Sequence, residues 1–387
     1  MSKIDELIKQ LCPDGIQYEQ LGENCEVLRG KRLTKKELHE DGNFPVFHGG
    51  LIPLGRYDKF NRSANQTMVI NTGSVGEVVW SSVDFWSSDG TFVIKTSDII
   101  NDRFLYYFLK TQESYLKTQK REGGVPTIDR QTVENLSIPI PPLAIQEEIV
   151  NILDTFTTLE AELEAELEAR KKQYTFYRDS LLSFEGKDVE WKTLGQVGEF
   201  VRGNGLQKKD FTESGVGCIH YGQIYTYYGT YTDKTKSFVS PELAKKLKKV
   251  NKGDLIITNT SENFEDVCKT VAWLGDNEIV TGGHATIFKH KENSKFLAYY
   301  TQTAAFFNEK KKYAQGAKVI DVSAKNLAKI LVPIPPIEEQ ERIVSILDKL
   351  DALVNSISFG LPAEIKSRRK QYEYYRNQLL TFAPIQN

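Results

Sequence analysis

The segment IPIPPLAIQEEIVNILD at residues 138–154 returns as VPIPPIEEQERIVSILD at residues 332–348, and eleven of the seventeen positions are identical. The prolines of each copy lack an N–H and bias their predecessors toward extended geometry, which predicts a stiff extended lead-in. The isoleucines and leucines that follow recur every three or four residues, which predicts an amphipathic helix behind the prolines. The chain therefore carries one extended-then-helical element twice.

The repetition covers the whole chain. RKKQYTFYRDSLLSF at 170–184 reappears as RRKQYEYYRNQLLTF at 368–382. Upstream, GIQYEQLGENCEVLRG at 15–30 is echoed by DVEWKTLGQVGEFVRG at 188–203. The marks follow the same order in both halves. A repeat of roughly 190 residues is a whole domain-sized unit and not one turn of a solenoid.

Each repeat has a mixed first part and a long helix. Short β-rich runs such as QTMVINT and TFVIK alternate with Gly and Asn turns, and a helical run begins near Asn101, which predicts an α/β (mixed α+β) globule. The first long helix, over 146–184, would span ~58 Å. The second, over 338–382, repeats the pattern, but Gly360 and Pro362 predict a break or kink within it.

The apolar stripe of each long helix needs a partner, and the other copy can supply it. We expect the two helices to pack antiparallel as a coiled-coil spacer, with the two globules related by pseudo-twofold symmetry. The predicted parts are a first globule at 1–142, a central spacer helix at 143–185, a second globule at 186–336 and a C-terminal spacer helix at 337–387.

The composition of the 387-residue chain is typical of a globular protein, with 40% apolar and 26% charged residues. The sequence contains no apolar run of ~18 residues and no apolar core of a signal peptide, so we expect a cytoplasmic protein without membrane contact. Its four cysteines lack C-x-x-C spacing, and its five histidines lack metal-ligand spacing, so we expect ordinary thiols and no metal site. The net charge of −2 hides basic clusters in the globules, since the first long helix is strongly acidic.

The order of globule, IPIPP-x3-Q-E helix, globule and the same helix resembles the specificity subunit of type I restriction-modification systems. The resemblance covers essentially the whole chain, and its most specific marks are Gln146/Glu147, Gln340/Glu341 and the paired K-Q-Y-x-[FY]-Y-R-x-x-L-L endings. It implies two target recognition domains, each reading one half of a bipartite double-stranded DNA sequence. It also implies helices that set the spacing between the half-sites.

The resemblance further implies partners that carry the chemistry. Two adenine methyltransferase subunits and restriction subunits would join this chain, with S-adenosylmethionine and ATP bound by the partners and no cofactor bound here. The repeat of Leu159, Leu163 and Leu167, each followed by Glu-Ala, is similar to four-residue repeats that tune the spacer in this family. Four helical residues add ~6 Å. A solvated Glu/Ala helix with a leucine seam would have the same pattern.

The sequence offers no catalytic motif. The Pro-Pro pairs lack the preceding Asn or Asp and the following aromatic residue that an adenine methyltransferase needs to hold its base. The segment VRGNGLQKK at 201–209 has neither G-x-G-x-x-G nor G-x-x-x-x-G-K-[ST] spacing. We therefore expect a chain that catalyses nothing.

The DNA-contact candidates form four pairs of segments at matching places in the two repeats. DNA readers grip phosphates with cations and reach base edges with polar side chains. The first pair contributes Arg29, Lys31 and Arg32 with Arg202, Asn204, Lys208 and Lys209. The second contributes His48 with His220, Tyr221, Gln223 and Tyr225, expected on a loop. The third contributes Asn71, Thr72 and Ser74 with Asn259, Thr260 and Ser261. The fourth, KTQKREGG at 117–124 and KKKYAQGAK at 310–318, contributes Lys120 and Arg121 with Lys311 and Lys318, and Lys310 belongs to the same basic run.

Each of these assignments has a structural alternative: a salt bridge for the paired arginines, half-buried strand positions for the tyrosines, and tight-turn chemistry for the Asn/Thr/Ser clusters. Two other functions also remain open. A protein-interaction scaffold would use the helices alone and would not need paired basic loops. A DNA-acting enzyme would need the missing catalytic motifs. The sequence leaves open the base sequence recognised, the exact spacer and the presence of a restriction subunit.

Overall fold

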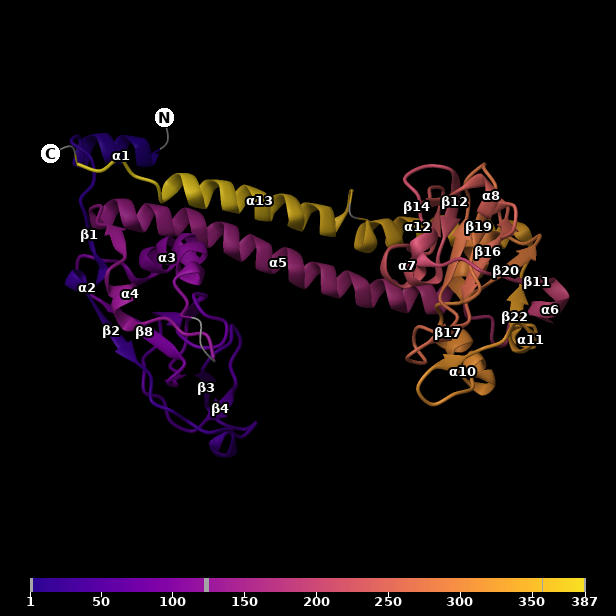
Figure 1. Cartoon of the computed structure of the whole chain (residues 1–387), viewed down its shortest axis with the longest axis horizontal. Coiled ribbons are helices and arrows are strands. Elements are labelled where there is room, and N and C mark those ends of the chain that lie inside the picture. The colour runs from indigo at the N-terminus through magenta and orange to yellow at the C-terminus, as the bar shows by residue number, and fades with distance from the viewer. Residues whose placement is uncertain (1–2, 122–124, 357, 386–387) are drawn as a thin grey trace. The chain divides into compact units, whose positions relative to one another are not determined.

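The computed structural model describes residues 3–121, 125–356 and 358–385. The chain forms two compact units: residues 1–163 with 365–387 are unit 1, and residues 164–364 are unit 2. The long helix α5 (Leu143–Leu181) therefore begins in unit 1 and ends in unit 2 (Figure 1). The helix α13 (Leu361–Leu379) begins in unit 2 and ends in unit 1.

Unit 1 contains three small sheets. The first has the order β2-β8-β5-β6 and is antiparallel throughout, the second has the order β4-β3-β7 with β3 and β7 parallel, and the third is the ribbon β1-β9. The strands are β1 (Tyr18–Gln20), β2 (Cys25–Arg29), β3 (Phe44–Phe47), β4 (Gly55–Tyr57), β5 (Gln66–Ile70), β6 (Val78–Ser81), β7 (Trp86–Ser87), β8 (Thr91–Thr96) and β9 (Ser137–Pro139). The helices are α1 (Lys3–Leu11), α2 (Leu21–Asn24), η1 (Lys35–Glu37), α3 (Asp102–Thr118), α4 (Arg130–Glu134) and the first part of α5.

Unit 2 repeats this plan with additions. Its sheets have the orders β11-β20-β16-β18-β13, β14-β12-β19-β15, β10-β22 and β17-β21. The strands are β10 (Glu190–Thr193), β11 (Gly198–Arg202), β12 (Val216–Ile219), β13 (Tyr231–Thr232), β14 (Ser237–Val239), β15 (Lys248–Val250), β16 (Leu255–Thr258), β17 (Thr260–Ser261), β18 (Thr270–Trp273), β19 (Ile279–Thr281), β20 (Ala285–His290), β21 (Ile320–Asp321) and β22 (Leu331–Ile334). The helices are α6 (Leu194–Val197), η2 (Lys208–Asp210), α7 (Tyr221–Thr226), α8 (Pro241–Ala244), α9 (Ser294–Tyr300), α10 (Ala304–Tyr313), α11 (Ala324–Leu327) and α12 (Ile337–Asn355).

Registers confirm that the two repeats share one fold. The residue pair Arg29↔Phe92 of unit 1 corresponds to Arg202↔Thr286 of unit 2, and each lies at the end of an antiparallel pair of strands. The parallel pair β3 and β7 corresponds to β12 and β19. The mixed helix-and-sheet fold and the repeat predicted from the sequence are therefore confirmed.

The core of each unit is completed by the start of its own long helix and by the end of the other repeat. In unit 1, Ile145, Ile149 and Leu153 of α5 are fully buried beside Leu380 and Phe382. Ring contact between Phe382 and Phe104 of α3, with centroids 6.4 Å apart, seals this packing. Unit 2 has the same arrangement, in which Ile343 and Leu347 of α12 share a core with Leu182 and Phe184. The boundary between the compact units therefore falls inside the long helices.

Within unit 1, the helices α5 and α13 run antiparallel. Phe156 of α5 stacks against Tyr375 of α13 with ring centroids 5.5 Å apart, whereas Glu160, one turn further along α5, pairs with Arg369, earlier in α13. The predicted break of the second helix is also confirmed. Gly360 lies between α12 and α13 with φ +99°, in the left-handed region that favours glycine.

The four cysteines are free thiols, three of them buried, as expected. Burial raises the pKa of Cys25, Cys218 and Cys268 to about 12 in each case. None of the helices in the described part of the chain is long and apolar enough to cross a membrane.

Candidate nucleic-acid interface

The joint between the long helix and the globule is held by a buried glutamine in each unit. Gln146 of α5 is fully buried, and its Oε1 accepts a hydrogen bond of 2.8 Å from the N–H of Asn101. Its Nε2 donates to the carbonyl oxygens of Ile99, at 2.9 Å, and Pro141, at 2.7 Å. Because Asn101 is the N-cap of α3, the glutamine fastens the start of α5 to the start of α3. This contact explains the glutamine that follows the prolines.

Unit 2 has the same joint. Gln340 is fully buried, accepts from the N–H of Asn293 at 3.0 Å and donates to the carbonyl of Pro335 at 2.9 Å. Asn293 is the N-cap of α9, the counterpart of Asn101. The amide of Gln340 also donates to the Glu292 carboxylate, where Gln146 meets a backbone carbonyl instead.

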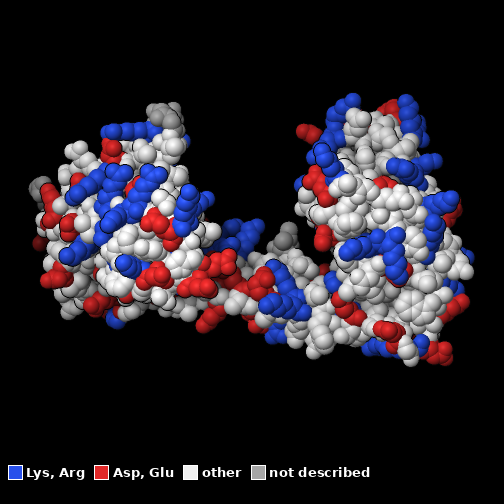
Figure 2. Space-filling model, turned by 90° about the horizontal axis from the view of Figure 1, so that it is seen from below, with Lys and Arg blue, Asp and Glu red and all other residues white. Residues whose placement is uncertain are grey.

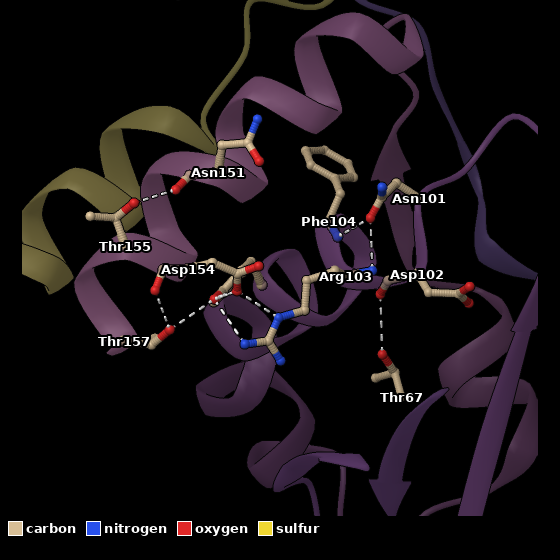
Figure 3. A network of polar contacts seen from close by, with 10 residues as sticks. Thr67, Asn101, Asp102, Arg103, Phe104, Asn151, Asp154, Thr155 and Thr157 are labelled. Carbon is tan, nitrogen blue, oxygen red and sulfur yellow. Dashed lines mark hydrogen bonds and ion pairs between the residues drawn. The ribbon is translucent and has the colours of Figure 1, made fainter. Parts of the chain in front are cut away.

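A second contact lies two turns further along each long helix. In Figure 3, Arg103 of α3 and Asp154 of α5 point toward one another, and the arginine Nε lies 2.8 Å from the carboxylate Oδ1. The buried hydroxyl of Tyr107 donates to the same carboxylate. In unit 2, Lys295 and Tyr299 make the equivalent contacts with Asp348, at 2.7 and 2.9 Å. These joints fix the direction in which each long helix leaves its globule.

Three of the four predicted segment pairs contact one loop in each unit, and the fourth contacts the third. We call this loop the central loop: Ser88–Gly90 between β7 and β8 of unit 1, and Gly282–His284 between β19 and β20 of unit 2. Sequence reasoning did not select either loop, although they lie 194 positions apart, the same offset as the proline segments. That offset was the signal that could have found them.

In the first pair of segments, a glycine of each segment, Gly30 or Gly203, packs against the backbone of the central loop. The N–H of Gly30 donates to the carbonyl of Thr91, and a Cβ on Gly30 would lie 2.0 Å from the carbonyl oxygen of Ser88. In unit 2 a Cβ on Gly203 would lie 2.1 Å from the carbonyl oxygen of Gly282. Only glycine allows this approach. The arginine before each glycine is exposed at the end of its strand, and no acidic group lies within 4 Å of Arg29 or Arg202 among the described residues. The salt-bridge alternative therefore gains no support.

The second pair differs between the units. His48 is half-exposed, and its Nδ1 lies 3.4 Å from the Asp89 carboxylate of the central loop. His220 is buried, and its Nδ1 accepts from the N–H of Gly222. Burial, together with Lys208 and His284, lowers the pKa of His220, so the ring stays neutral at pH 7.

The loop predicted after His220 is wrong, because residues 221–226 form the helix α7. Gln223 caps this helix: its Oε1 accepts from the N–H of His220 at 3.0 Å, and its Nε2 donates to Ser237 at 2.7 Å. The hydroxyl of Tyr225 donates to the carbonyl of Thr260 at 2.6 Å. A capping pattern of this kind is hidden in the sequence by the histidine at the N-cap.

The amides of the third pair are buried. Asn259 donates from Nδ2 to the carbonyl of Val322 at 3.0 Å and accepts at Oδ1 from Thr286 at 2.8 Å. Its counterpart Asn71 is 3% exposed. Both backbones also hydrogen-bond to the central loop, at Gly90 and His284. These asparagines therefore support the site from beneath, while Thr72, Ser74, Thr260 and Ser261 lie nearer the surface.

The fourth pair joins the third. Thr127 bridges both Thr72 and Arg121 in unit 1, and Asp321 bridges both Thr260 and Gln315 in unit 2. Residues 122–124 of the predicted basic segment lie outside the described residues.

The cations of the fourth pair differ in their surroundings. Lys120, Lys311 and Lys318 are exposed, and Arg121 pairs with Asp129. Lys310 belongs to the same basic run, but it is not part of a solvated basic face, because its buried ammonium donates to the carbonyls of Glu265 and Val267 at 2.9 and 2.6 Å.

The exposed cations of the first pair lie beside this convergence. Lys31, Arg32, Lys208 and Lys209 are exposed, with the last two on η2. The side chain of Asn204, in contrast, holds the backbone of Lys246 and Lys248 at 3.0 and 3.1 Å. Figure 2 shows Lys and Arg side chains gathered on the face of unit 1 seen from below, the end that carries β3 and β4.

Two further side chains join the site, and sequence reasoning missed both. Asp89 faces His48, as described above. His284 is exposed, its ring lies 4.8 Å from that of Tyr221, and its Nδ1 lies 3.2 Å from the Thr260 hydroxyl. Among the described residues, no group of three or more His, Cys, Asp and Glu side chains is arranged to hold a metal ion.

The chain is thus a duplicated α+β protein with exposed cations at matching places in both repeats and a long helix that follows the first. Comparison with known families identifies the class of protein to which this arrangement belongs. The model of the type I restriction modification DNA specificity domain matches residues 13–169 and again 186–367. The chain belongs to this family of type I restriction-modification specificity subunits, and its class of function is DNA sequence recognition.

Relatives support the assignment over the full length. The chain is 33% identical to the specificity subunit of the type I restriction enzyme EcoR124I/EcoR124II from Escherichia coli, over 99% of this chain and 98% of that protein. It is 30% identical to a putative type I restriction enzyme specificity subunit of Haemophilus influenzae, over 95% and 96%. The fold is similar to the solved S subunit of M. genitalium, with a TM-score of 0.60 at 20% identity, covering 95% of this chain and 96% of that chain.

Proposed function

We propose that this chain is the non-catalytic reader of a bipartite double-stranded DNA target. Each unit reads one half-site, and partner subunits carry out the chemistry: two methyltransferase subunits modify adenines, and restriction subunits cut the DNA. S-adenosylmethionine and ATP belong to those partners. The observation that carries the proposal is the duplicated gathering of three polar segments on one central loop, with exposed cations on the first and fourth segments, because a single reading site would need it only once.

Phosphate contact falls to the exposed cations Arg29, Lys31, Arg32, Lys120, Arg202, Lys208, Lys209, Lys311 and Lys318. Base reading falls to the surface groups around the central loops, chiefly His48 in unit 1 and Tyr221 and His284 in unit 2. The amides of Gln223, Asn204 and Asn259 are occupied by the fold, and reading by them would require those hydrogen bonds to break. They therefore act as supports in this proposal.

The helices supply the spacing and the docking surface. Leu159, Leu163 and Leu167 repeat at four-residue intervals, and one such interval adds ~6 Å, comparable to ~1.7 base pairs. Each unit also exposes one aromatic pair from the repeated helix endings: Phe176 and Tyr177 on α5, and Tyr374 and Tyr375 on α13. Two equivalent exposed pairs suit two copies of one partner.

The test is to co-express the chain with its methyltransferase subunit and map modified adenines across the host genome. A motif of two short blocks with a fixed unspecified gap is expected. Removing four residues of the Leu-Glu-Ala-Glu repeat should shorten the gap and leave both blocks intact. A single continuous motif would refute two-unit reading. If a folded, co-purifying complex gave no motif, the chain would instead be a protein-interaction scaffold, and its DNA binding would lack a steep salt dependence.

A further inference from the structure

The loop that joins β3 to β4 in unit 1 ends in an exposed apolar tip. Its sequence is GGLIPLG at 49–55, and the exposed fractions are 52% for Leu51, 78% for Ile52 and 39% for Leu54, with Pro53 exposed between them. Four consecutive exposed apolar residues cost solubility and contribute nothing to the core, so they indicate a contact surface. Single exposed apolar residues elsewhere need no such explanation.

The tip is fastened to the candidate DNA face. The N–H of Leu54 donates to the carbonyl of Val46 at 2.8 Å, and the carbonyl of Gly49 accepts from the N–H of Ser74 at 2.8 Å. A Cβ on Gly49 would lie 2.5 Å from the carbonyl oxygen of Thr72, so the loop root needs glycine to pack this closely. The root of the tip therefore packs against the turn that carries Thr72 and Ser74.

Cations lie close to the root of the tip in the chain. A Cβ on Gly55, at the start of β4, would lie 3.0 Å from the side chain of Leu38, so Leu38 packs against the end of the loop. Lys35 and Lys36 precede Leu38, Lys59 follows β4, and all three are exposed. An aliphatic tip with cations near its root matches a partner with an anionic rim and an apolar interior, which describes a DNA base step between its phosphates.

We propose that Leu51 and Ile52 form a wedge that inserts between two adjacent base pairs of the half-site read by unit 1 and unstacks them. The proposal deepens the DNA-reading function above and rests on it. Aliphatic wedges of this kind kink DNA, and their insertion favours steps that unstack easily. The wedge thus adds sequence preference at a step where the protein makes no hydrogen bond to a base.

The corresponding connection of unit 2, all of which the structure describes, carries no such aliphatic tip. The connection after β12 holds the helix α7 and exposes Tyr227, at 56%, in place of an aliphatic tip. The ammonium of Lys236 lies 4.5 Å from the centre of the Tyr227 ring. Unstacking is therefore expected in one half-site of the target and not in the other.

The experiment uses the complex with its methyltransferase subunit and the DNA target mapped for that complex. The fluorescent base 2-aminopurine is placed in turn at each purine position of both half-sites, except at the methylated adenine, which the methyltransferase extrudes itself. The wild-type complex should raise the fluorescence several-fold at one step of one half-site. The variant Leu51→Ala/Ile52→Ala should abolish that rise and weaken binding about tenfold, with the two-block motif retained.

Val83→Ala is the matched control, because Val83 is 53% exposed in the same unit and lies outside the loop. It should leave the fluorescence rise intact. A rise that persists in the Leu51→Ala/Ile52→Ala variant, or the absence of any rise with the wild type, would overturn the wedge while leaving DNA reading in place. If that variant lost its methyltransferase subunit on gel filtration, the tip would be a protein-docking surface and the wedge would also be overturned. A wild-type complex without a two-block motif would refute the DNA-reading function itself.

Discussion

The two units are alike where the long helix meets the globule and unlike at the proposed DNA-reading face. Gln146 and Gln340 make the same contacts with an N-cap asparagine and a proline carbonyl. The central loops, in contrast, read Ser-Asp-Gly in unit 1 and Gly-Gly-His in unit 2. The difference indicates that the joint must hold one geometry, because it sets the direction of the long helix, whereas under the proposed function the central loop is free to vary with the half-site.

The largest effect should come from breaking a joint. Gln146→Ala removes three hydrogen bonds from a site with no exposure and leaves a buried N–H and two carbonyls unpaired, so unit 1 should lose about 3 kcal/mol of unfolding free energy. Hydrogen exchange should rise in α3 and not in α9, and Gln340→Ala should give the reverse. Glu147→Ala, at an exposed neighbouring position, is the control. Equal exchange in both helices would contradict the idea of two independent joints.

The next largest effect should be a difference between the two units in their loss of stability at low pH. His290 of β20 lies where β8 of unit 1 has Thr96, and burial lowers the pKa of His290 to about 4. The folded state thus holds the neutral ring, so stability is full above the unfolded pKa of about 6.5 and is lost as the pH falls toward 4.

The loss in unit 2 should reach about 2–3 kcal/mol. His290→Thr should largely remove it, as judged by urea unfolding of the wild type and the variant at pH 7 and pH 4.5. His39→Thr, at an exposed position in unit 1, should change little. A pH dependence that His290→Thr leaves unaltered would assign the acid lability to other groups.

A smaller effect tests whether arginine and lysine are interchangeable in the ion pair with the aspartate of the long helix. Arg103 and Lys295 hold equivalent aspartates, but the Arg103 guanidinium also lies 4.9 Å from the Trp80 ring and 4.8 Å from the Tyr107 ring. Arg103→Lys keeps the charge and loses this stacking, so it should cost unit 1 about 1 kcal/mol in thermal unfolding. Lys295→Arg is the reciprocal variant. A cost near that of Gln146→Ala would mean that the guanidinium is indispensable to the joint.

The smallest effect concerns phosphate contacts. Arg32→Ala should weaken DNA binding a few-fold for every sequence and lower the slope of log affinity against log salt by about 1. Titration with labelled target DNA between low and moderate salt measures both quantities. Lys252→Ala is the control, since Lys252 already pairs with Asp276 at 2.6 Å. An unchanged slope for Arg32→Ala would remove Arg32 from the phosphate contacts.

The sequence by itself determined the elements that rest on local patterns. The duplicated proline segments predicted extended lead-ins followed by helices, the alternation of apolar runs with turns predicted the strands, and Gly360 with Pro362 predicted the helix break. These outcomes depend on φ preference, N–H loss and periodicity within a few residues, all of which a single chain displays.

Only the tertiary structure decided which of the candidate side chains face outward. Gln223 caps α7, Asn259 binds Val322 and Thr286, and Lys310 is buried against two carbonyls. The sequence analysis grouped these residues with Arg29 and Lys31 as candidates for DNA contact. A polar side chain has the same letter in the sequence whether it binds solvent, DNA or its own backbone. The convergence on the central loop depends on contacts between segments that are distant in the chain, such as Gly30 with Ser88 and Gly203 with Gly282. The completion of each core by the other repeat's last turn joins residues more than a hundred positions apart, such as Phe104 with Phe382. No local pattern encodes either set of contacts.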